Sequence, residues 1–122
     1  MNQSHNFYEL IEECRPQVKE ITVTEVQEIL NSPHKFTLID VRESNEWARG
    51  KIPHAVHLSM ANLADQISRI ISDKNSKIIL YCAAGYRSII AAANLQELGY
   101  LNVASMAGGI GAWVNSGYKI II

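Results

Sequence analysis

The alternation of apolar, strand-length runs with helical patterns is the feature that most limits what this chain can fold into. The runs at 36–41 and 77–81 are almost wholly apolar, which is typical of strands buried on both faces of a parallel sheet. Segments with helical spacing follow them, at 43–49 and 87–98. Strands that alternate with helices predict an α/β fold with three layers, a mainly parallel central sheet flanked by helices on both faces.

The rest of the chain fits the same alternation. An amphipathic helix is expected over 6–20, where Cys14 falls on the apolar stripe as a small buried hydrophobe. The residues from Thr24 to Gln27 are interpreted as a capping box that opens a second helix. Further strands are expected at 21–23, 52–58 and 101–106, and further helices from 62 to 71 and from Gly108 through Trp113.

Size and charge restrict the class of protein. A chain of 122 residues suits one domain that needs no disulfide or metal to fold, and we expect a helical extension over 1–20 before a domain at 21–122. The net charge of −1 argues against nucleic acid or an anionic membrane as a partner. No run approaches the roughly 18 apolar residues of a membrane span, and no signal-peptide pattern is present. The two cysteines lack metal-ligand spacing, so we expect a cytoplasmic protein with reduced thiols and no metal site.

The stretch LYCAAGYRS, at 80–88, carries the strongest indication of chemistry. Cys82 ends a predicted strand, at the edge of a parallel sheet where ligands bind. From Ala83 the chain leads into a helix, so successive amide N–H groups converge into an anion cradle. Gly85 permits the tight curl, and Arg87 adds a positive charge with a planar set of donors. These groups favour the thiolate, which is the nucleophilic form of cysteine.

The other loop residues have less specific roles. Ala84 contributes a backbone amide, and Ser88 contributes a hydroxyl or a helix cap. Tyr86 either shapes access to the site or is an exposed loop residue. The structural alternative for the whole loop is that Cys82 packs in the core and Arg87 is a solvated helix residue.

Three sequence motifs resemble those of the single-domain rhodanese-like sulfurtransferase family and occur in the same order as in that family, over about residues 20–118. LIDVRESNEWARGKIPHAVHL (38–58) is similar to the family's Asp-Val-Arg stretch followed by Gly-His-Ile-Pro-Gly-Ala. CAAGYRS resembles its active-site loop, and MAGGIGAWVNSGY (106–118) resembles its Gly-Gly-x-x-x-Trp. This chain has Lys51 where the family has histidine and His54 where it has glycine. Residues 21–122 are therefore expected to form a rhodanese-like domain.

The resemblance implies that Cys82 is a sulfur carrier. Its thiolate would take a sulfane sulfur from an anionic donor, thiosulfate or a persulfide, and hold it as a persulfide against the amides of Ala83 to Ser88. Cyanide, a cellular thiol or a protein sulfur carrier would then remove the sulfur. Because backbone amides stabilise the added charge, no metal or organic cofactor is implied.

Three residues outside the loop are implied as support of the site. Asp40 and Arg42 match the family's Asp and Arg and are expected to hold neighbouring loops in place. A carboxylate at the end of a buried strand needs a partner, which Arg42 or a backbone amide can supply. Glu46 is expected to pair with an arginine or to cap backbone amides.

Three other functions compete with sulfur transfer. Cysteine phosphatases, including those of the same fold, use Cys-x5-Arg, whereas four residues separate Cys82 from Arg87 here. The shorter loop makes a smaller cradle, which suits one sulfur better than a phosphoryl group. Inactive binding modules of the family would lack the cysteine, and a redox thiol would need a resolving partner, for which Cys14 is the one candidate in the sequence.

Overall fold

The computed structural model describes residues 6–122, so residues 1–5 of the expected 1–20 extension lie outside the described part. The helices are α1 (Phe7–Cys14), the short 3-10 helix η1 (Arg15–Gln17), α2 (Val23–Leu30), α3 (Ser44–Arg49), α4 (Met60–Ile70), α5 (Arg87–Glu97) and α6 (Gly109–Asn115). The strands are β1 (Lys19–Ile21), β2 (Thr37–Asp40), β3 (Val56–His57), β4 (Ile78–Tyr81) and β5 (Val103–Met106).

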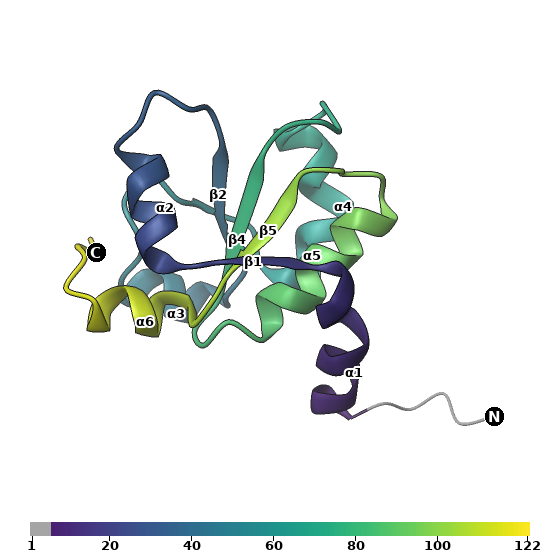
Figure 1. The fold of residues 1–122 in the computed structure, drawn as a ribbon, viewed down its shortest axis with the longest axis horizontal. Coiled ribbons are helices and arrows are strands. Elements are labelled where there is room, and N and C mark those ends of the chain that lie inside the picture. Colours follow the sequence, from purple (N-terminus) through teal and green to yellow (C-terminus); the bar gives the residue numbers. More distant parts are fainter. Residues whose placement is uncertain (1–5) are drawn as a thin grey trace.

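The strands form one sheet in the order β1-β5-β4-β2-β3, and each neighbouring pair is parallel (Figure 1). From β2 the chain continues to β3 on one side, whereas from β4 it continues to β5 on the other. The direction of winding therefore reverses between β2 and β4, and open parallel sheets bind ligands beyond the strand ends at such a point. The predicted three-layer α/β fold is confirmed.

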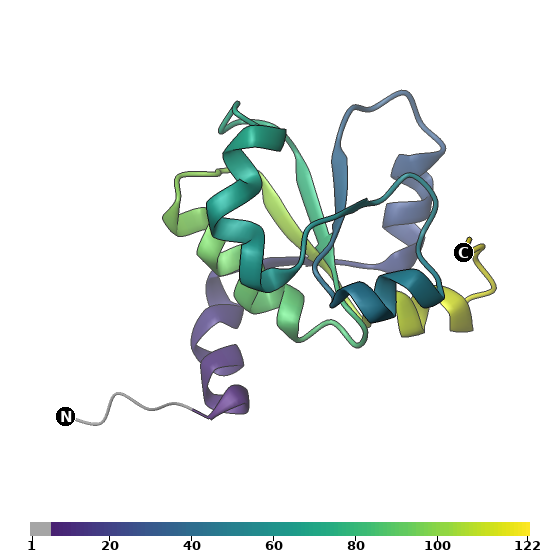
Figure 2. The same ribbon diagram turned by 180° about the vertical axis from the view of Figure 1, so that it is seen from behind.

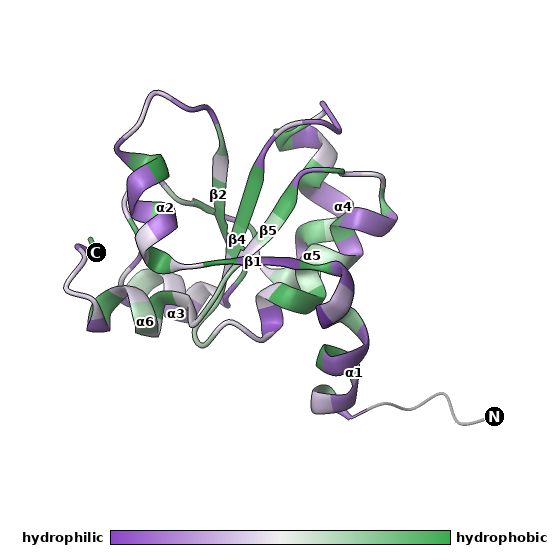
Figure 3. Ribbon diagram, viewed as in Figure 1, coloured by the Kyte–Doolittle hydropathy of each residue, from purple (hydrophilic) through white to green (hydrophobic). Residues whose placement is uncertain are grey.

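Two apolar cores lie on opposite faces of this sheet. Along β4, Ile78 and Leu80 belong to one core, and Ile79 and Tyr81 belong to the other, as the alternation of side chains along a strand requires. Helices α1, α4 and α5 cover the first core, and α2 and α6 cover the second (Figures 1 and 2). Figure 3 shows β4 and β5 as mostly hydrophobic at the centre of the fold, and α2 and α4 with both hydrophobic and hydrophilic stretches.

The first strand and the helix after it begin earlier than the sequence predicted. β1 ends at Ile21, and Thr22 is the N-cap of α2. The Thr22 hydroxyl accepts a hydrogen bond from the Glu25 amide at 3.1 Å, and the Glu25 carboxylate accepts one from the Thr22 amide at 3.1 Å. The capping box predicted from Thr24 is therefore wrong by two residues, because a carboxylate in the first helical turn is a stronger cap than the amide of Gln27.

The predicted strand at 52–58 is reduced to Val56–His57. His54 interrupts the extended run, since its φ of +73° lies in the left-handed region. Glycine adopts that conformation without steric cost, which fits the glycine that the resemblance places there. Smaller shifts occur elsewhere: α4 begins at Met60 and β5 at Val103, each within two residues of the predicted start.

The predicted helix over 6–20 is confirmed only in its first half. α1 ends at Cys14, Pro16 lies in the 3-10 turn, and Lys19 already pairs with β5. Ile11 is buried in the core shared with α5, and Cys14 packs half-buried against the same core. Within residues 6–122, no helix has both the length and the apolar character that a membrane crossing requires.

Candidate active site

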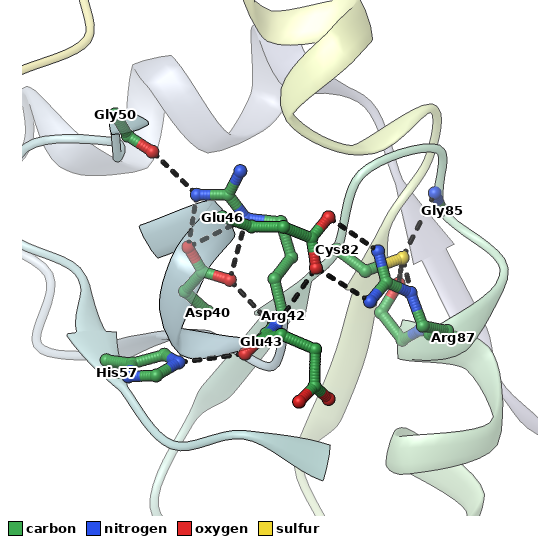
Figure 4. A network of polar contacts seen from close by, with 10 residues as sticks. Asp40, Arg42, Glu43, Glu46, Gly50, His57, Cys82, Gly85 and Arg87 are labelled. Carbon is green, nitrogen blue, oxygen red and sulfur yellow. Dashed lines mark hydrogen bonds and ion pairs between the residues drawn. The ribbon is translucent and has the colours of Figure 1, made fainter. Parts of the chain in front are cut away.

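The candidate site lies where β2 and β4 end side by side. Asp40 is in register with Tyr81, so the residues that follow the two strands emerge at one edge of the sheet. Cys82 comes directly after β4, and Arg42 comes two residues after Asp40. The edge is the one at which winding reverses, as predicted for both Asp40 and Cys82. Figure 4 shows the polar network that these residues form.

The Cys82 sulfur receives backbone hydrogen bonds from its own loop. The Gly85 amide donates to Cys82 Sγ at 3.2 Å, and the Ser88 amide donates to it at 3.4 Å. Cys82 is otherwise enclosed, with 1% of its surface exposed. Two N–H dipoles that point at one buried sulfur stabilise negative charge there, which is the arrangement that an anionic nucleophile needs.

A pair of serine hydroxyls lies behind the sulfur. Ser88 Oγ is 3.4 Å from Cys82 Sγ and 2.7 Å from Ser105 Oγ, and both serines are fully buried. Ser105 lies on β5, the strand next to β4. Ser105 was not among the residues predicted for the site, because only the pairing of β5 with β4 brings it near the loop.

Helix α6 holds the backbone of the loop from the other side. The Ile110 amide donates to the Cys82 carbonyl oxygen at 2.9 Å, and the Gly111 amide donates to that of Ala83 at 3.0 Å. These amides belong to the first turn of α6, where no helical partner is available to them. The first two loop residues are therefore fixed by hydrogen bonds from a segment more than 20 residues further along the chain.

Glycines allow this close contact between the loop and α6. Gly85 has a φ of +93°, and a Cβ there would lie 2.7 Å from the Gly108 amide nitrogen. Gly109 has a φ of +61°, and a Cβ there would overlap the carbonyl oxygens of Cys82 and Ala83. The Gly-Gly pair of the third motif is thus a contact surface for the loop that follows Cys82, a role that was not predicted from the sequence.

Arg87 is held by Glu46 rather than by the sulfur. Its two terminal nitrogens each donate to one carboxylate oxygen of Glu46 at 3.0 Å. The hydrogen bonds from Arg87, helped by the amide of Glu43, lower the pKa of Glu46 to about 2 although partial burial opposes them. Glu46 therefore both pairs with an arginine and caps a backbone amide, the two contacts predicted for it. The charge of Arg87 is balanced by this carboxylate.

Asp40 and Arg42 form a buried ion pair beside the loop. The Arg42 side chain donates to both carboxylate oxygens of Asp40, at 2.8 to 3.0 Å, and the Arg42 amide donates to one of them at 2.9 Å. The same guanidinium also donates to the Gly50 carbonyl oxygen at 2.6 Å. The predicted partnership is confirmed, and its contacts connect the end of β2 to the end of α3. Their supporting role in catalysis stays a prediction.

An aromatic stack extends this support. His57 Nε2 is 2.8 Å from the Arg42 carbonyl oxygen, and the His57 ring stacks on that of Trp47, with centroids 5.0 Å apart.

Tyr81, in the second core, also makes a polar contact near the site. Its hydroxyl accepts a hydrogen bond from the Ile52 amide at 3.2 Å. Burial, together with the charge of Asp40, raises the pKa of Tyr81, so this phenol stays protonated at neutral pH.

Two cavities adjoin the network, and they differ in their relation to the sulfur. One of about 190 Å³ is lined by Cys82 itself and by Phe7, Ala83, Ala84, Tyr86 and Arg87. A larger one of about 370 Å³ lies between α3 and α6, where it contacts Arg42 and Glu46 but not Cys82. The smaller cavity is the one that reaches Cys82. Tyr86 is 46% exposed and lines this cavity, a position that suits both alternatives given for it, a residue that shapes access and an exposed loop residue.

The strand-end cysteine, its amide donors and the small cavity define a class of protein, an α/β domain with a buried cysteine sulfur that accepts backbone hydrogen bonds beside a cavity. The family follows from comparison. A model of the rhodanese-like domain matches residues 22–116, and the chain belongs to the rhodanese-like family.

Individual relatives and solved structures agree with this assignment. A sulfurtransferase of Allochromatium vinosum is 35% identical over 104 residues, which cover 85% of this chain and 95% of the relative. The thiosulfate sulfurtransferase GlpE of Coxiella burnetii is 32% identical over 95 residues, covering 78% of this chain and 86% of the relative.

Among solved structures, a rhodanese-related protein from Thermoplasma volcanium is similar with a TM-score of 0.73 and 29% identity, over 84% of this chain and 97% of that one. A protein of unknown function from Rhodopseudomonas palustris, termed a possible tyrosine phosphatase, matches with a TM-score of 0.87 and 26% identity over 99% of both chains. The second match includes the N-terminal segment that the family model does not cover.

Proposed function

We propose that this protein is a sulfurtransferase that carries a sulfane sulfur on Cys82 as a persulfide. The observation that supports the proposal most directly is the convergence of the Gly85 and Ser88 amides on Cys82 Sγ. The names of the sulfurtransferase relatives from two bacteria agree with it. The substrates are a small anionic sulfur donor and a thiophilic acceptor, which is cyanide, a thiol or a protein sulfur carrier.

In the first step, the Cys82 thiolate attacks the outer sulfur of thiosulfate. A sulfur–sulfur bond forms to Sγ, the sulfur–sulfur bond of the donor breaks, and sulfite leaves with the electron pair. The enzyme is then a persulfide, and its terminal sulfur carries the negative charge. The amides between Ala83 and Ser88 are fixed before the reaction, so they stabilise this charge without rearrangement.

In the second step, the acceptor attacks the terminal sulfur. The bond between the two sulfurs of the persulfide breaks, and the thiolate of Cys82 leaves under the same amide donors. Asp40, Arg42 and Glu46 are positioning residues in this proposal, since their contacts are with one another, with the backbone and with Arg87 rather than with the sulfur.

Steady-state kinetics test this proposal. With thiosulfate and cyanide as substrates, the protein should form thiocyanate, and double-reciprocal plots should be parallel because the two substrates react in separate steps. Cys82→Ser should abolish the reaction, and Cys14→Ser should keep it because Cys14 lies half-buried on α1. Absence of thiocyanate, with cleavage of an aryl phosphate instead, would contradict sulfur transfer and favour the phosphatase alternative.

A further inference from the structure

The cavity beside Cys82 includes a residue from outside the family's own domain. Phe7, the first residue of α1, lines the cavity together with Ala83, Ala84 and Tyr86. The family model begins only at residue 22, so the N-terminal helix is an addition to the matched domain. An added helix that contributes one wall of the cavity next to the nucleophile is in a position to influence which substrates reach it.

The position of Phe7 is fixed by the packing of its helix. The Asn6 side chain caps α1 by accepting a hydrogen bond from the Glu9 amide at 2.8 Å. Ile11, one turn further along, is 3% exposed and lies in the core that α5 also covers. Further on, the Gln96 side chain of α5 donates to the Gln17 carbonyl oxygen at 2.9 Å. Helix α1 therefore lies against α5, the helix that begins at Arg87 and completes the catalytic loop (Figures 1 and 2).

The side chains that line the cavity are apolar apart from those of Cys82, Tyr86 and Arg87. Phe7 is 43% exposed and Tyr86 is 46% exposed, so both rings present free surface at its mouth. Arg87 is the charged residue of its lining, and the guanidinium of Arg87 already binds both carboxylate oxygens of Glu46. A dianion such as thiosulfate that enters this cavity thus contacts two aromatic rings and a guanidinium whose charge Glu46 already neutralises. A donor with one negative charge and an apolar group can bury that group against the rings.

We propose that Phe7 is a specificity-determining residue that favours organic sulfur donors, in which a carbon group takes the place of one thiosulfate oxygen (a thiosulfonate) or an S–R group takes the place of the sulfonate (an organic persulfide). The inference rests on the proposed persulfide chemistry of Cys82. For a thiosulfonate, the Cys82 thiolate bonds to the outer sulfur and a sulfinate leaves with the electron pair of the broken bond. For an organic persulfide, the same attack releases a thiolate. The charge is the same on both sides of each step.

Three donors of graded size test the inference. Benzenethiosulfonate, methanethiosulfonate and thiosulfate should each be mixed with the enzyme, and the rate constant for sulfur uptake should be measured by intact mass. In the unaltered protein, benzenethiosulfonate should react faster than methanethiosulfonate. In Phe7→Ala this ratio should fall by about 5- to 20-fold, the effect of losing one side of an apolar contact, and thiosulfate should change by less than about 2-fold.

Two further variants separate specificity from a general effect on α1. Phe7→Leu keeps an apolar wall and should retain part of the preference. Glu12→Ala changes an exposed side chain of the same helix that lines no part of the Cys82 cavity, and should leave the ratio unchanged. An unchanged ratio in Phe7→Ala, or an equal loss for all three donors, would overturn the inference while sulfur uptake itself stands. Uptake from none of the donors by the unaltered protein would contradict the proposed function as well.

Discussion

At the residue scale, each arginine of the candidate site is paired with a carboxylate. Arg42 binds Asp40 in the interior, and Arg87 binds Glu46 nearer the surface. The two pairs differ in exposure, since the Asp40 and Arg42 side chains are 0% and 7% exposed whereas those of Glu46 and Arg87 are 26% and 31% exposed. The consequences of breaking them should therefore differ in size and in pH dependence.

Removing the carboxylate charge of Asp40 should be the more costly change. Asp40→Asn leaves the Arg42 guanidinium buried without a counter-charge, and we expect the free energy of unfolding to fall by about 3 kcal/mol or more. Urea denaturation measures this directly. Asp65→Asn, at an exposed position on α4, is the matched control and should cost less than about 0.5 kcal/mol. Equal, small losses in both variants would contradict a stabilising role for the buried pair.

The ion pair between Glu46 and Arg87 should make a pH-dependent contribution to the free energy of unfolding. The pKa of Glu46 is lowered from 4.5 to about 2 in the folded protein. A lowered pKa means that the stabilisation is complete above pH 4.5 and is lost as the pH falls toward 2. Glu46→Gln should lower the free energy of unfolding by about 1 kcal/mol at pH 7, a modest value because the pair is partly solvated. The difference between variant and parent should shrink as unfolding is followed from pH 5 to pH 2, and a constant difference would argue against this ion pair.

At the element scale, the contact between α6 and the loop that follows Cys82 is sensitive to side-chain size. Gly109→Ala puts a methyl group against the carbonyls of Cys82 and Ala83, and it also strains a left-handed residue. We expect a loss of about 2 kcal/mol or more in stability and at least about a 10-fold loss in the rate of sulfur uptake, because the loop must move.

The control for this variant is another left-handed glycine. Gly117 has a φ of +83°, and nothing lies within 4 Å of a Cβ added to it. Gly117→Ala should therefore lower the free energy of unfolding by about 1 kcal/mol, the cost of backbone strain alone, and should leave the rate of sulfur uptake unchanged. A similar loss of uptake in both variants would show that the loop does not depend on its contact with α6.

A substitution in the connection before β3 should increase the stability of the protein rather than lower it. His54 holds a φ of +73° where glycine would be unstrained. His54→Gly should raise the free energy of unfolding by up to about 1 kcal/mol, since the relieved strain exceeds the added freedom of the unfolded chain. His54→Ala keeps the strain and should give no gain. Thermal unfolding of the three proteins compares them, and a destabilised glycine variant would contradict the assignment of strain.

At the scale of the whole molecule, the parts that the sequence predicted are those that depend on local patterns. The run at 77–81 identified β4 and therefore placed Cys82 at the edge of the sheet. The spacing of Asp40 and Arg42 was short enough for their pairing to be inferred. The capping box was misplaced because two threonines, Thr22 and Thr24, both precede an acid or an amide at the right spacing.

The parts that were not predicted depend on contacts between distant segments. Glu46 and Arg87 are 41 residues apart, and the expectation that Glu46 pairs with an arginine did not say which one. Ser105 reaches the loop only because β5 lies next to β4, and Phe7 reaches it only because α1 packs on α5. No local spacing encodes these neighbours, so they follow from the topology of the sheet and from helix packing.

The central claim about this protein is that Cys82 holds a sulfur atom. The measurement that tests this claim directly is the intact mass of the protein after thiosulfate without an acceptor, followed by the mass after cyanide, for the parent and for Cys82→Ser. The parent should gain one sulfur atom, located on the peptide that contains Cys82 and removed by cyanide, and the variant should gain none. A parent that takes up no sulfur from thiosulfate or from an organic donor, or a variant that takes up as much, would contradict it.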